Sequence, residues 1–528
     1  MKNIVSIYDG HDTNITFFNA KTNQYHIIEV ERLLKKRYVG IQYNPIFENL
    51  SEIELFLEEC QDIATKFWGI ENNYECVLIN WGWKRSRTVF ENVFKSDKYL
   101  TFTNHHFNHA YSSFYQSPYK EALILSYDGG GEGEYFNFYM GNSDGIVLLE
   151  KIPINMGRGY WSSASLIKEI LNNKPSFRYD DDNEVGLVDP YEYYDSWLRI
   201  KSYAGKLMGL CGYGTINEDL LPHLREFFIK KDGKIKKQIS NYKLYKEKEG
   251  QNFAATIQKT MEDILFEKLD NYDNNMPLVV TGGCALNVII NEKIKDRYKR
   301  EVYVPPNPND GGLSLGHIFS YQKPKEKVNI TYNGLPLLDI DQLKDYDIKK
   351  VSKKDIAKLL KCGKIIGLVY GDSEVGPRAL GNRSIVCDPS IPEMKDILNS
   401  KVKHREWYRP FAPFCKKEDA HKYFESRDFE NMEYMSFAVK VKVDTLPSIT
   451  HVDGTARLQT VTEESHSHFY QLLTEFGKIS DTNVLLNTSF NSRGKPILST
   501  ISDAVQILKE TELDCVVIND YLINNIKK

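Results

Sequence analysis

Two histidines four positions apart are the first residues whose type and spacing could do chemistry. His105 and His109 lie in the segment Asn104-His-His-Phe-Asn-His-Ala110. Residues four apart on a helix project from one face, so both imidazoles could bind one metal ion. A pair at this spacing also arises by chance, with one histidine capping the helix and the other packed in the core. Further candidate ligands are needed to favour a metal site.

Two aspartates that precede glycines supply those candidates. Asp128 ends an apolar stretch and is followed by Gly129 and Gly130, and Asp310 follows the proline-rich turn 305–309. Two histidines with two carboxylates form a plausible ligand set for iron, manganese or zinc. Glycines after each aspartate allow phosphate oxygens to approach backbone amides. The sequence therefore predicts that a metal ion and a nucleotide share one site.

A further glycine turn follows a predicted strand at Leu278–Val280. It has the sequence Thr281-Gly-Gly-Cys-Ala-Leu-Asn287, and a helix is expected after it. Gly282 and Gly283 permit close backbone approach to a ligand. This pattern is typical of a nucleotide-binding turn, and we expect Gly282, Gly283 and Asn287 to contact the nucleotide.

Positive charges gather in three separated motifs of the C-terminal part, and a neutral motif follows them. Arginine offers a planar fork for phosphate and carboxylate oxygens, and lysine offers a point charge, so the mixture suits polyanionic reactants. Ordinary surface ion pairing is the alternative for each motif, although nearby glycines and prolines favour loops. The motifs are Glu374-Val-Gly-Pro-Arg378-Ala-Leu-Gly-Asn-Arg383-Ser384, Lys403-His-Arg405-Glu-Trp-Tyr-Arg409-Pro-Phe-Ala-Pro413, His451-Val-Asp-Gly-Thr-Ala-Arg457 and Asn487-Thr-Ser-Phe-Asn491.

The elements that must position these residues alternate between strands and helices. The stretch Asn3–Phe18 predicts two strands joined by a tight loop that displays His11 and Asp12. Apolar residues at helical spacing predict a helix over Glu52–Phe67, and Cys76–Asn80 predicts a strand.

Further along the chain, Ala110–Tyr115 is predicted to be helical, and Ala122–Tyr127 with Tyr135–Met140 to form a hairpin around a glycine-rich bend. The stretch 320–350 is rich in Lys, Asn and Asp and has little periodic pattern. A new helix-then-strand unit begins over Lys354–Tyr370. We therefore place a domain boundary near residue 340.

Bulk composition excludes several classes of protein. The 528 residues carry a net charge of -4 with charges of both signs, so no overall basic footprint indicates nucleic acid or membrane. The eight cysteines have no paired spacing, which argues against a disulfide framework or zinc cluster. The apolar stretch near the N-terminus is too short for a secretory signal, and no run is long enough to span a membrane. We expect a cytoplasmic protein, and the oligomeric state stays open.

Taken in order, these motifs resemble the O-carbamoyltransferase family of antibiotic and nodulation-factor biosynthesis, over nearly the whole chain. Ten motifs in register are more specific than any one of them. They are Gly10-His-Asp12, His105-His-Phe-Asn-His109-Ala, Asp128-Gly-Gly-Gly, Gly205-Lys-Leu-Met-Gly-Leu210, Gly282-Gly-Cys-Ala-Leu-Asn287, Asp310-Gly-Gly-Leu, Gly376-Pro-Arg-Ala-Leu-Gly-Asn-Arg-Ser384, Arg409-Pro-Phe-Ala-Pro413, Asp453-Gly-Thr-Ala-Arg457 and Asn487-Thr-Ser-Phe-Asn491.

The resemblance implies an α/β protein with two domains. An actin-like ATPase-type domain, similar to the tRNA threonylcarbamoyl-transferring subunit, would cover residues 1–340, and a YrdC-like domain would cover 341–528. The C-terminal domain would convert carbamoyl phosphate and ATP into carbamoyl adenylate, releasing phosphate and pyrophosphate. The adenylate would then move to the N-terminal domain, which transfers the carbamoyl group to an acceptor hydroxyl.

The resemblance also implies roles for individual residues. Carbamoyl phosphate would be held by Lys403, Arg409 and Arg457, while Arg378, Arg383 and the Asn487–Asn491 loop would help to bind ATP with its Mg²⁺. The metal ligands would be His105, His109, Asp128 and Asp310, with Fe²⁺ as the expected ion. His11, beside Asp12, would orient or deprotonate the acceptor hydroxyl, because the pKa of a histidine lies near working pH.

The acceptor is less defined, because the family's alanine-rich segment is Thr13-Asn-Ile-Thr16 here. A sugar-like metabolite is the default acceptor, and a nucleobase hydroxymethyl group in a nucleotide or in DNA is the second. Rings and cations in Asn80–Arg87 could stack bases and neutralise phosphates, or could be a buried tryptophan pair. The aromatic and acidic stretch 177–194 favours an acceptor pocket, and the lysine-rich stretch 230–248 predicts an exposed hairpin.

Two rival interpretations remain. A tRNA threonylcarbamoyl-type transferase would share the N-terminal motifs but would not normally carry a fused domain with Arg409-Pro-Phe-Ala-Pro413. A non-enzymatic actin-like nucleotide-binding protein would bind ATP without consuming carbamoyl phosphate, and the full set of predicted phosphate-binding residues argues against it.

Overall fold

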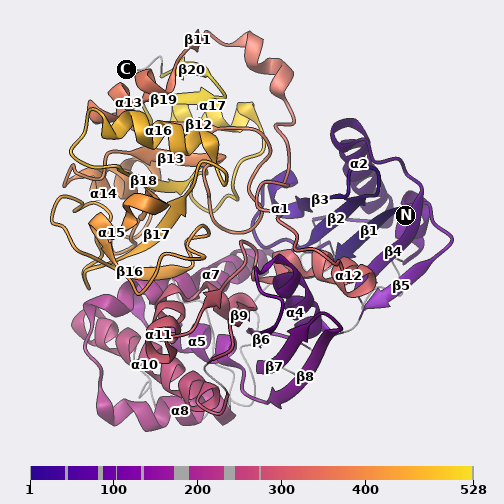
Figure 1. The fold of residues 1–528 in the computed structure, drawn as a ribbon, viewed down its shortest axis with the longest axis horizontal. Coiled ribbons are helices and arrows are strands. Elements are labelled where there is room, and N and C mark those ends of the chain that lie inside the picture. Colours follow the sequence, from indigo (N-terminus) through magenta and orange to yellow (C-terminus); the bar gives the residue numbers. More distant parts are fainter. Residues whose placement is uncertain are drawn as a thin grey trace.

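A computed structural model describes residues 2–41, 46–80, 87–102, 104–131, 136–171, 190–230, 244–272 and 275–525. Two five-stranded sheets form the N-terminal half (Figure 1). The first has the order β3 (Gln24–Glu29), β2 (Asn14–Asn19), β1 (Asn3–Tyr8), β4 (Tyr74–Asn80), β5 (Tyr99–Phe102). The second has the order β10 (Val302–Tyr303), β9 (Leu278–Thr281), β6 (Ala122–Tyr127), β7 (Phe136–Asn142), β8 (Gly145–Ile152).

Two helices lie between these sheets. α12 (Leu313–Gln322) packs on β1, β2 and β4, and α4 (His105–Gln116) packs on β6, β7 and β9. The two helices also pack on each other, as Figure 1 shows. One apolar cluster joins Ile4 of β1, Ile124 of β6 and Leu315 of α12. The helices therefore fix one sheet relative to the other.

Alternation along β1 explains how the first sheet is covered on both faces. Ile4 packs toward α4 and α12, whereas Val5 and Ile7 pack into a second cluster with α2 (Leu50–Trp68) and α3 (Arg87–Val93). Successive strand residues point to opposite faces, so one strand supplies both cores. The short helix α1 (Val30–Leu33) follows β3.

Helices also cover the far face of the second sheet. Leu123 and Leu125 of β6 belong to a large cluster that also contains Leu207 and Ile257. The same cluster continues into the C-terminal half, so the two halves share buried apolar surface. The helices are α5 (Met156–Ala164), α6 (Lys168–Leu171), α7 (Pro190–Leu210), α8 (Leu221–Lys230), α10 (Glu247–Leu269) and α11 (Val288–Tyr298).

The C-terminal half is built on a third sheet of ten strands. Helices α13 (Lys353–Lys361) and α16 (Ser467–Gly477) cover one face, and α14 (Met394–Ile397) and α17 (Ile501–Glu510) contribute to the core on the other. A short helix, α15 (Ala420–Tyr423), precedes β15. The strand order is β11 (Lys349–Lys350), β20 (Tyr521–Asn524), β19 (Cys515–Ile518), β12 (Ile366–Val369), β13 (Arg383–Cys387), β18 (Val484–Ser489), β14 (Ala412–Lys416), β17 (Thr455–Val461), β16 (Phe437–Val441), β15 (Phe424–Glu425).

The predicted α/β class is confirmed, as are the two strands around His11, the helix over Glu52–Phe67 and the unit at Lys354–Tyr370. The actin-like and YrdC-like assignments and the boundary at residue 340 stay predictions. Three segments used to argue about the acceptor fall mainly or partly outside the described residues, namely Asn80–Arg87, 177–194 and the hairpin expected within 230–248.

The cysteines behave as small core residues. All eight are free thiols, and Cys362 alone among them is exposed. In the part of the chain that the structure describes, no helix is long and apolar enough to cross a membrane.

Candidate active sites

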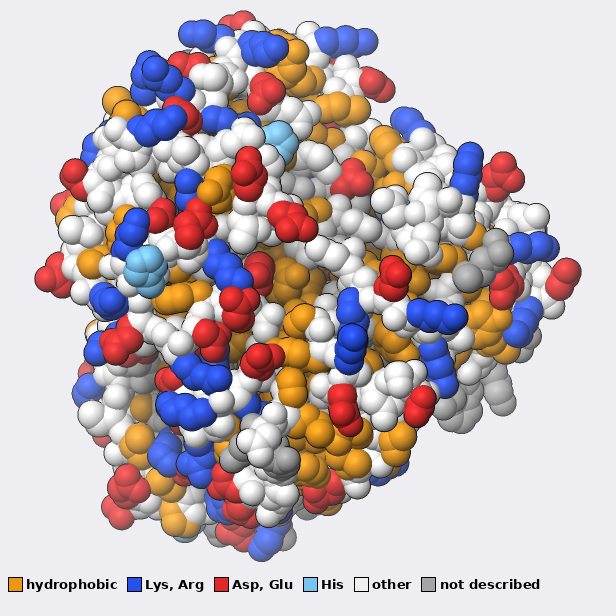
Figure 2. All heavy atoms as spheres, in the orientation of Figure 1, with side chains coloured by type: hydrophobic (Ala, Val, Ile, Leu, Met, Phe, Trp, Pro, Cys, Tyr) orange, Lys and Arg blue, Asp and Glu red, His pale blue; other side chains and the backbone are white. Residues whose placement is uncertain are grey.

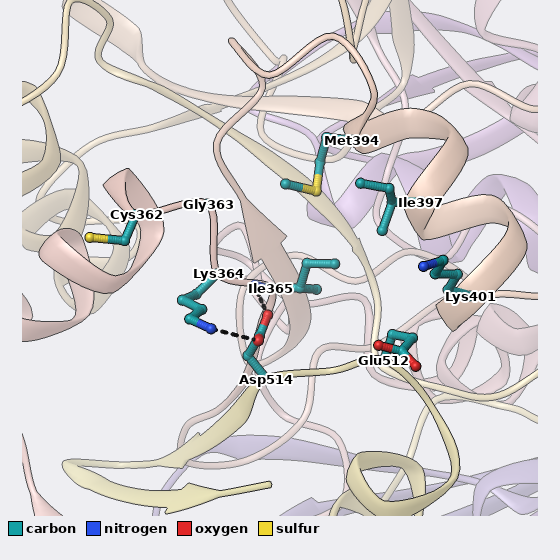
Figure 3. A pocket seen from close by; sticks show the side chains of 9 residues that line it. All are labelled: Cys362, Gly363, Lys364, Ile365, Met394, Ile397, Lys401, Glu512 and Asp514. Atoms are coloured by element: carbon teal, nitrogen blue, oxygen red, sulfur yellow. Dashed lines mark hydrogen bonds and ion pairs between the residues drawn. The ribbon is translucent and has the colours of Figure 1, made fainter. Parts of the chain in front are cut away.

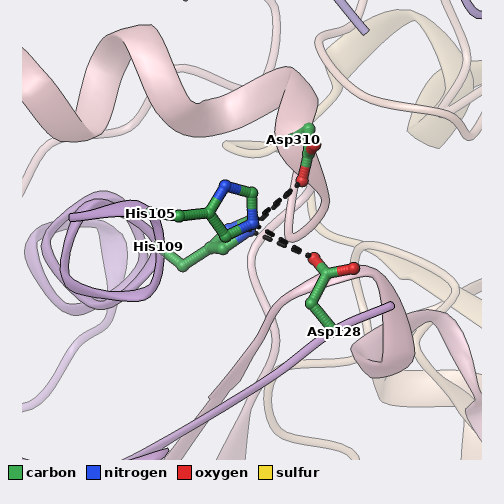
Figure 4. Close-up of side chains that lie close together, drawn as sticks. All are labelled: His105, His109, Asp128 and Asp310. Carbon is green, nitrogen blue, oxygen red and sulfur yellow. Dashed lines mark hydrogen bonds and ion pairs between the residues drawn. The ribbon is translucent and has the colours of Figure 1, made fainter. Parts of the chain in front are cut away.

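The two histidines and two aspartates predicted as metal ligands lie together (Figure 4). His109 Nε2 is 3.2 Å from Asp128 Oδ2 and 3.3 Å from Asp310 Oδ1. His105 Nε2 is 3.8 Å and 3.5 Å from the same two oxygens, and the two Nε2 atoms are 3.1 Å apart. All four candidate ligand atoms lie within 4.8 Å of one another.

Three elements bring these side chains together. Asn104 caps α4 by accepting a hydrogen bond from Phe107 N at 2.9 Å, so His105 and His109 occupy the first two turns. Asp128 directly follows β6, and Asp310 begins the short 3-10 helix Asp310–Gly312 that leads into α12. The carboxyl end of a strand and the N-terminal ends of two helices therefore meet at this point.

The donor set fits a divalent transition metal ion. Atoms bound at about 2.1 Å from one ion are about 3.0 to 3.4 Å apart, close to the distances found here. Burial lowers the pKa of His109, but Asp128 and Asp310 raise it to about 9. The two carboxylates therefore favour a positive charge at this position, which a metal ion would supply. His106 points elsewhere, with Nδ1 2.8 Å from Ser126 Oγ.

His11 and Asp12 lie beside this cluster, as predicted from the loop after β1. His11 Nδ1 is 2.9 Å from Asp12 Oδ2, and His11 Nε2 is 3.2 Å from Asp310 Oδ2. Burial and Lys201 lower the pKa of His11, but Asp12 and Asp310 raise it above its usual value overall. The imidazole is 26% exposed, so an acceptor can reach it.

The glycine turns adjoin the same cluster. Gly283 N donates to Asp128 Oδ2 at 2.9 Å, and Gly129 N donates to the other oxygen of that carboxylate. Gly282 has a φ of 89°, and a Cβ there would lie 2.1 Å from the carbonyl oxygen of Tyr127. A Cβ on Gly130 would meet no atom within 4 Å, so open space adjoins this backbone.

Cations from the predicted motifs form a second cluster in the C-terminal half. Burial lowers the pKa of Arg378 to about 10, with Arg409 and Arg37 contributing. Burial also lowers the pKa of Arg457, helped by Arg378, Arg405 and Arg409. Cations held close enough to disfavour one another's charge form a site prepared for an anion.

Lys403 joins this cluster with the Asn487–Asn491 loop. Its amino group donates to Ser489 O at 2.7 Å and to Asn491 O at 2.9 Å, and also to Asn491 Oδ1. Burial lowers its pKa well below the usual value, and Arg405, Arg409 and Arg37 add to this effect. The loop therefore helps to place the lysine.

Three further predicted ligand-binding side chains make hydrogen bonds within the protein, as Lys403 and Asn491 do. The fully buried Arg383 donates to the carbonyls of Tyr370, Gly371, Asn382 and Leu335, because it closes the turn between β12 and β13. Asn487 donates to Ala379 O and Gln459 Oε1. Asn287 caps α11 and donates to Gln258 Oε1. These contacts show that the three side chains support the surrounding loops, and the expectation that they also contact a ligand stays a prediction.

Sequence reasoning missed several residues at the two sites. Tyr8 Oη donates to Asp310 Oδ2 at 2.9 Å. Burial lowers the pKa of Lys201, while Asp12, Asp310 and Asp128 raise it, which places this lysine of α7 beside the metal cluster. Arg37 acts on Arg378 and Lys403 from the N-terminal half. The run Lys35-Lys36-Arg37 was a usable signal for Arg37, whereas nothing in the spacing of Lys201 indicated its role.

Two cavities lie in or beside the C-terminal half. A cavity of about 230 Å³ contains the paired Lys364 and Asp514, with Met394 and Ile397 opposite, and none of the predicted site residues lines it (Figure 3). A narrower cavity of about 10 Å³ lies between the turn after β9 and Arg378. Its lining residues are Ala285, Leu286, Val288, Pro305, Pro306, Pro308, Arg378, Tyr434, Met435 and Ser436.

Comparison with known proteins gives two family-model matches. Residues 64–318 match the model described as "Carbamoyltransferase N-terminus", and residues 357–525 match "Carbamoyltransferase C-terminus". The matched ranges contain both the metal-ligand cluster and the cation cluster.

Several curated proteins are similar over most of their length. "Nodulation protein NolO" of Bradyrhizobium diazoefficiens is 31% identical, over 80% of this chain and 78% of that protein. "Nodulation protein NolNO" of Sinorhizobium fredii is also 31% identical, over 80% of this chain, which spans 64% of that protein. "3'-hydroxymethylcephem-O-carbamoyltransferase" of Streptomyces clavuligerus is 29% identical, over 81% and 80%.

A solved structure is similar at a much lower level. The crystal structure of HypF from T. kodakarensis aligns with 60% of this chain and 47% of its own, with 12% identity and a TM-score of 0.36. A score this low does not identify a shared fold.

Proposed function

The chain belongs to the carbamoyltransferase family, and from this premise we propose that it is an ATP-dependent O-carbamoyltransferase that works at two sites. Carbamoyl phosphate and water give carbamate and phosphate at the cation cluster. A carbamate oxygen then attacks the α-phosphorus of ATP, and pyrophosphate leaves. At the second site the acceptor hydroxyl attacks the carbamoyl carbon, and AMP leaves with the former carbamate oxygen.

The cation cluster supports the first reaction. Arg378, Arg405, Arg409 and Arg457 converge with Lys403, and burial lowers the pKa values of Arg378, Arg405, Arg457 and Lys403. Negative charge accumulates on phosphate oxygens as pyrophosphate leaves, and fixed cations stabilise that charge without reorganisation. An actin-like N-terminal domain and a YrdC-like C-terminal domain are part of this proposal.

The histidine and aspartate cluster supports the second reaction. His105, His109, Asp128 and Asp310 would hold a divalent ion, which we propose is Fe²⁺, and Mg²⁺ would accompany ATP. Such an ion supplies Lewis-acid stabilisation of phosphate and carbonyl oxygens. His11 lies at the rim of this cluster with Asp12 on its other nitrogen, so it can take the acceptor's proton while Asp12 orients its ring.

The observation that carries the proposal is the presence of two sites of opposite charge in one chain. An enzyme that only transferred threonylcarbamoyl from a separately made adenylate would not need the cluster around Arg457. A non-enzymatic role is excluded by membership of an enzyme family.

For the acceptor we propose a hydroxyl-bearing metabolite. Figure 2 shows Lys and Arg interspersed with Asp and Glu over one face of the molecule, not a basic stripe of the kind that follows a DNA backbone. The name of the Streptomyces clavuligerus relative describes carbamoylation of a hydroxymethyl group, which fits a small organic acceptor.

Mass spectrometry of the reaction products tests this function. The enzyme would be incubated with metal, ATP, carbamoyl phosphate and a panel of sugar alcohols, hydroxymethyl nucleotides and hydroxymethylated DNA. We expect AMP and pyrophosphate, with a carbamoyl group added to a metabolite acceptor. A gain on DNA alone would replace the metabolite with a nucleic-acid acceptor, and the absence of both AMP and pyrophosphate would contradict the proposed reaction.

A further inference from the structure

The motif Gly205–Leu210 has no role in either site as described above. It forms the last part of α7, and its lysine is buried at the junction of the two halves. Lys206 Nζ donates to Ile170 O at 3.1 Å and lies 3.0 Å from Glu406 Oε1. A lysine in such a place keeps its charge only because a carboxylate faces it.

Glu406 lies in the segment that carries Lys403, Arg405 and Arg409. Its second oxygen, Oε2, is 3.7 Å from Arg409 Nη1. Burial raises the pKa of Glu406, but Lys206 and Arg409 are among the groups that lower it to about 2. The carboxylate is therefore charged and lies between a cation of the N-terminal half and a cation of the proposed phosphate site.

The two distances show how this carboxylate is shared. At 3.0 Å the contact with Lys206 is a close ion pair, whereas the 3.7 Å contact with Arg409 is longer and weaker. The Arg409 side chain is 36% exposed, so its guanidinium can still meet an anion. A tight bond to Glu406 would instead neutralise Arg409 and turn it away.

The same end of α7 contacts the hairpin that carries Arg457. His451 Nε2 is 3.0 Å from Gly209 O, and a Cβ on Gly212 would lie 2.6 Å from His451 Cε1. Gly212, just beyond α7, therefore allows the hairpin that carries Arg457 to approach closely.

We propose that Lys206 is a positioning residue for Arg409. By holding Glu406, it keeps that carboxylate from capturing Arg409, so the guanidinium stays available to the phosphate group of the donor. This role rests on the proposed function only in naming carbamoyl phosphate as the anion.

Calorimetric titration of carbamoyl phosphate into full-length protein variants tests this role. In Lys206→Met the buried Glu406 loses Lys206 and keeps Arg409, so the carboxylate should draw the guanidinium away from the donor phosphate. We expect the Kd for carbamoyl phosphate to rise about tenfold, which is the effect of losing one charge-assisted contact. In Lys206→Met/Glu406→Gln the competing charge is gone, and we expect the Kd to return toward that of the unmodified protein.

Lys295→Met is the matched control. Lys295 is also buried and pairs with a carboxylate of the other half, Asp428, at 2.6 Å, away from the cation cluster. We expect it to lower Tm without changing the Kd for carbamoyl phosphate.

An unchanged Kd in Lys206→Met would overturn the proposal, and so would a double variant that binds as weakly as the single one, because that is the result of a purely structural contact. If the unmodified protein binds carbamoyl phosphate but releases no pyrophosphate with ATP, the proposed function fails while this inference stands.

Discussion

At the scale of single residues, the two sites differ in how neighbouring charges act on a buried cation. At the first site, carboxylates flank imidazoles and raise the pKa of His109. At the second site, cations crowd one another, and burial lowers the pKa of Arg457. The first arrangement suits a metal cation and the second suits phosphate, so under the proposed function each site has variants that should affect one reaction alone.

Arg457→Met should remove most activation. The guanidinium lies among Arg378, Arg405 and Arg409. In the proposed reaction, negative charge would develop there on the leaving pyrophosphate. Loss of one such group typically lowers the rate by about 100-fold to 1000-fold, measurable as pyrophosphate release. Arg427→Met, at a more exposed arginine beside Asp428, is the control and should keep the normal rate.

His11→Asn should stop transfer and leave activation intact. The imidazole lies between Asp12 and Asp310, and general-base assistance typically contributes about 100-fold to 10000-fold. Carbamoylated product and pyrophosphate would be quantified in the same reaction. Equal loss of both would show that His11 does not act at a separate transfer site.

The sequence identified candidate site residues by type and spacing, but it did not show which groups surround each side chain. The spacing of His105 and His109 predicted that both side chains could bind one metal ion, and in the structure their Nε2 atoms are 3.1 Å apart. Arg383 was indistinguishable from Arg378 in sequence, because both are arginines in one glycine-rich motif. Only the fold shows that Arg383 is surrounded by backbone carbonyls, whereas Arg378 lies among other cations.

At the scale of elements, the N-terminal end of α4 determines where the candidate metal ligand His105 lies. His105 is the first residue of α4, so the position of its ring depends on how the helix begins at Asn104. Periodicity located this helix from Ala110 onward but not its start, because the polar residues His105, His106 and Asn108 carry no apolar pattern.

Asn104→Ala should weaken metal binding as well as the helix. Loss of an N-cap costs about 1 kcal/mol, and here the freed turn carries a metal ligand. Asn49→Ala removes an equivalent cap from α2, where Asn49 accepts from Glu52 N, and is the control. Both variants should lower Tm, and Asn104→Ala alone should raise the Kd for the metal. Equal metal affinity in the two variants would refute the link between cap and ligand.

A buried histidine in β3 should make stability fall at mildly acidic pH. His26 stacks on Trp68 of α2, and burial lowers its pKa from 6.5 to about 4. The neutral ring contributes stability above pH 6.5, and this contribution is lost as pH falls from 6.5 toward 4, by up to about 3 kcal/mol.

His26→Phe removes this titration while keeping an aromatic ring against Trp68. The difference in Tm between the unmodified protein and this variant should move in favour of the variant between pH 7.5 and pH 5. A difference that stays constant with pH would show that His26 titrates normally in the folded state.

At the scale of the whole molecule, the two halves are not independent. They share one apolar cluster, and Arg32 of α1 donates to the carbonyls of Glu374 and Gly376, which lie four and two positions before Arg378. The order of the motifs predicted both halves of the chain. It did not predict these contacts, because the residues that form them are far apart in the sequence. Arg32 and Glu374 are 342 positions apart. The two candidate sites are therefore joined by contacts between residues far apart in the sequence.

In the proposed function, activation and transfer occur at different sites of the molecule. The most direct measurement is exchange of labelled pyrophosphate into ATP in the presence of carbamoyl phosphate, compared between Asp128→Asn and Arg457→Met. We predict that exchange persists in Asp128→Asn, which loses a metal ligand and product formation, and disappears in Arg457→Met. Loss of exchange in both variants, or persistence in both, would contradict the division into two sites.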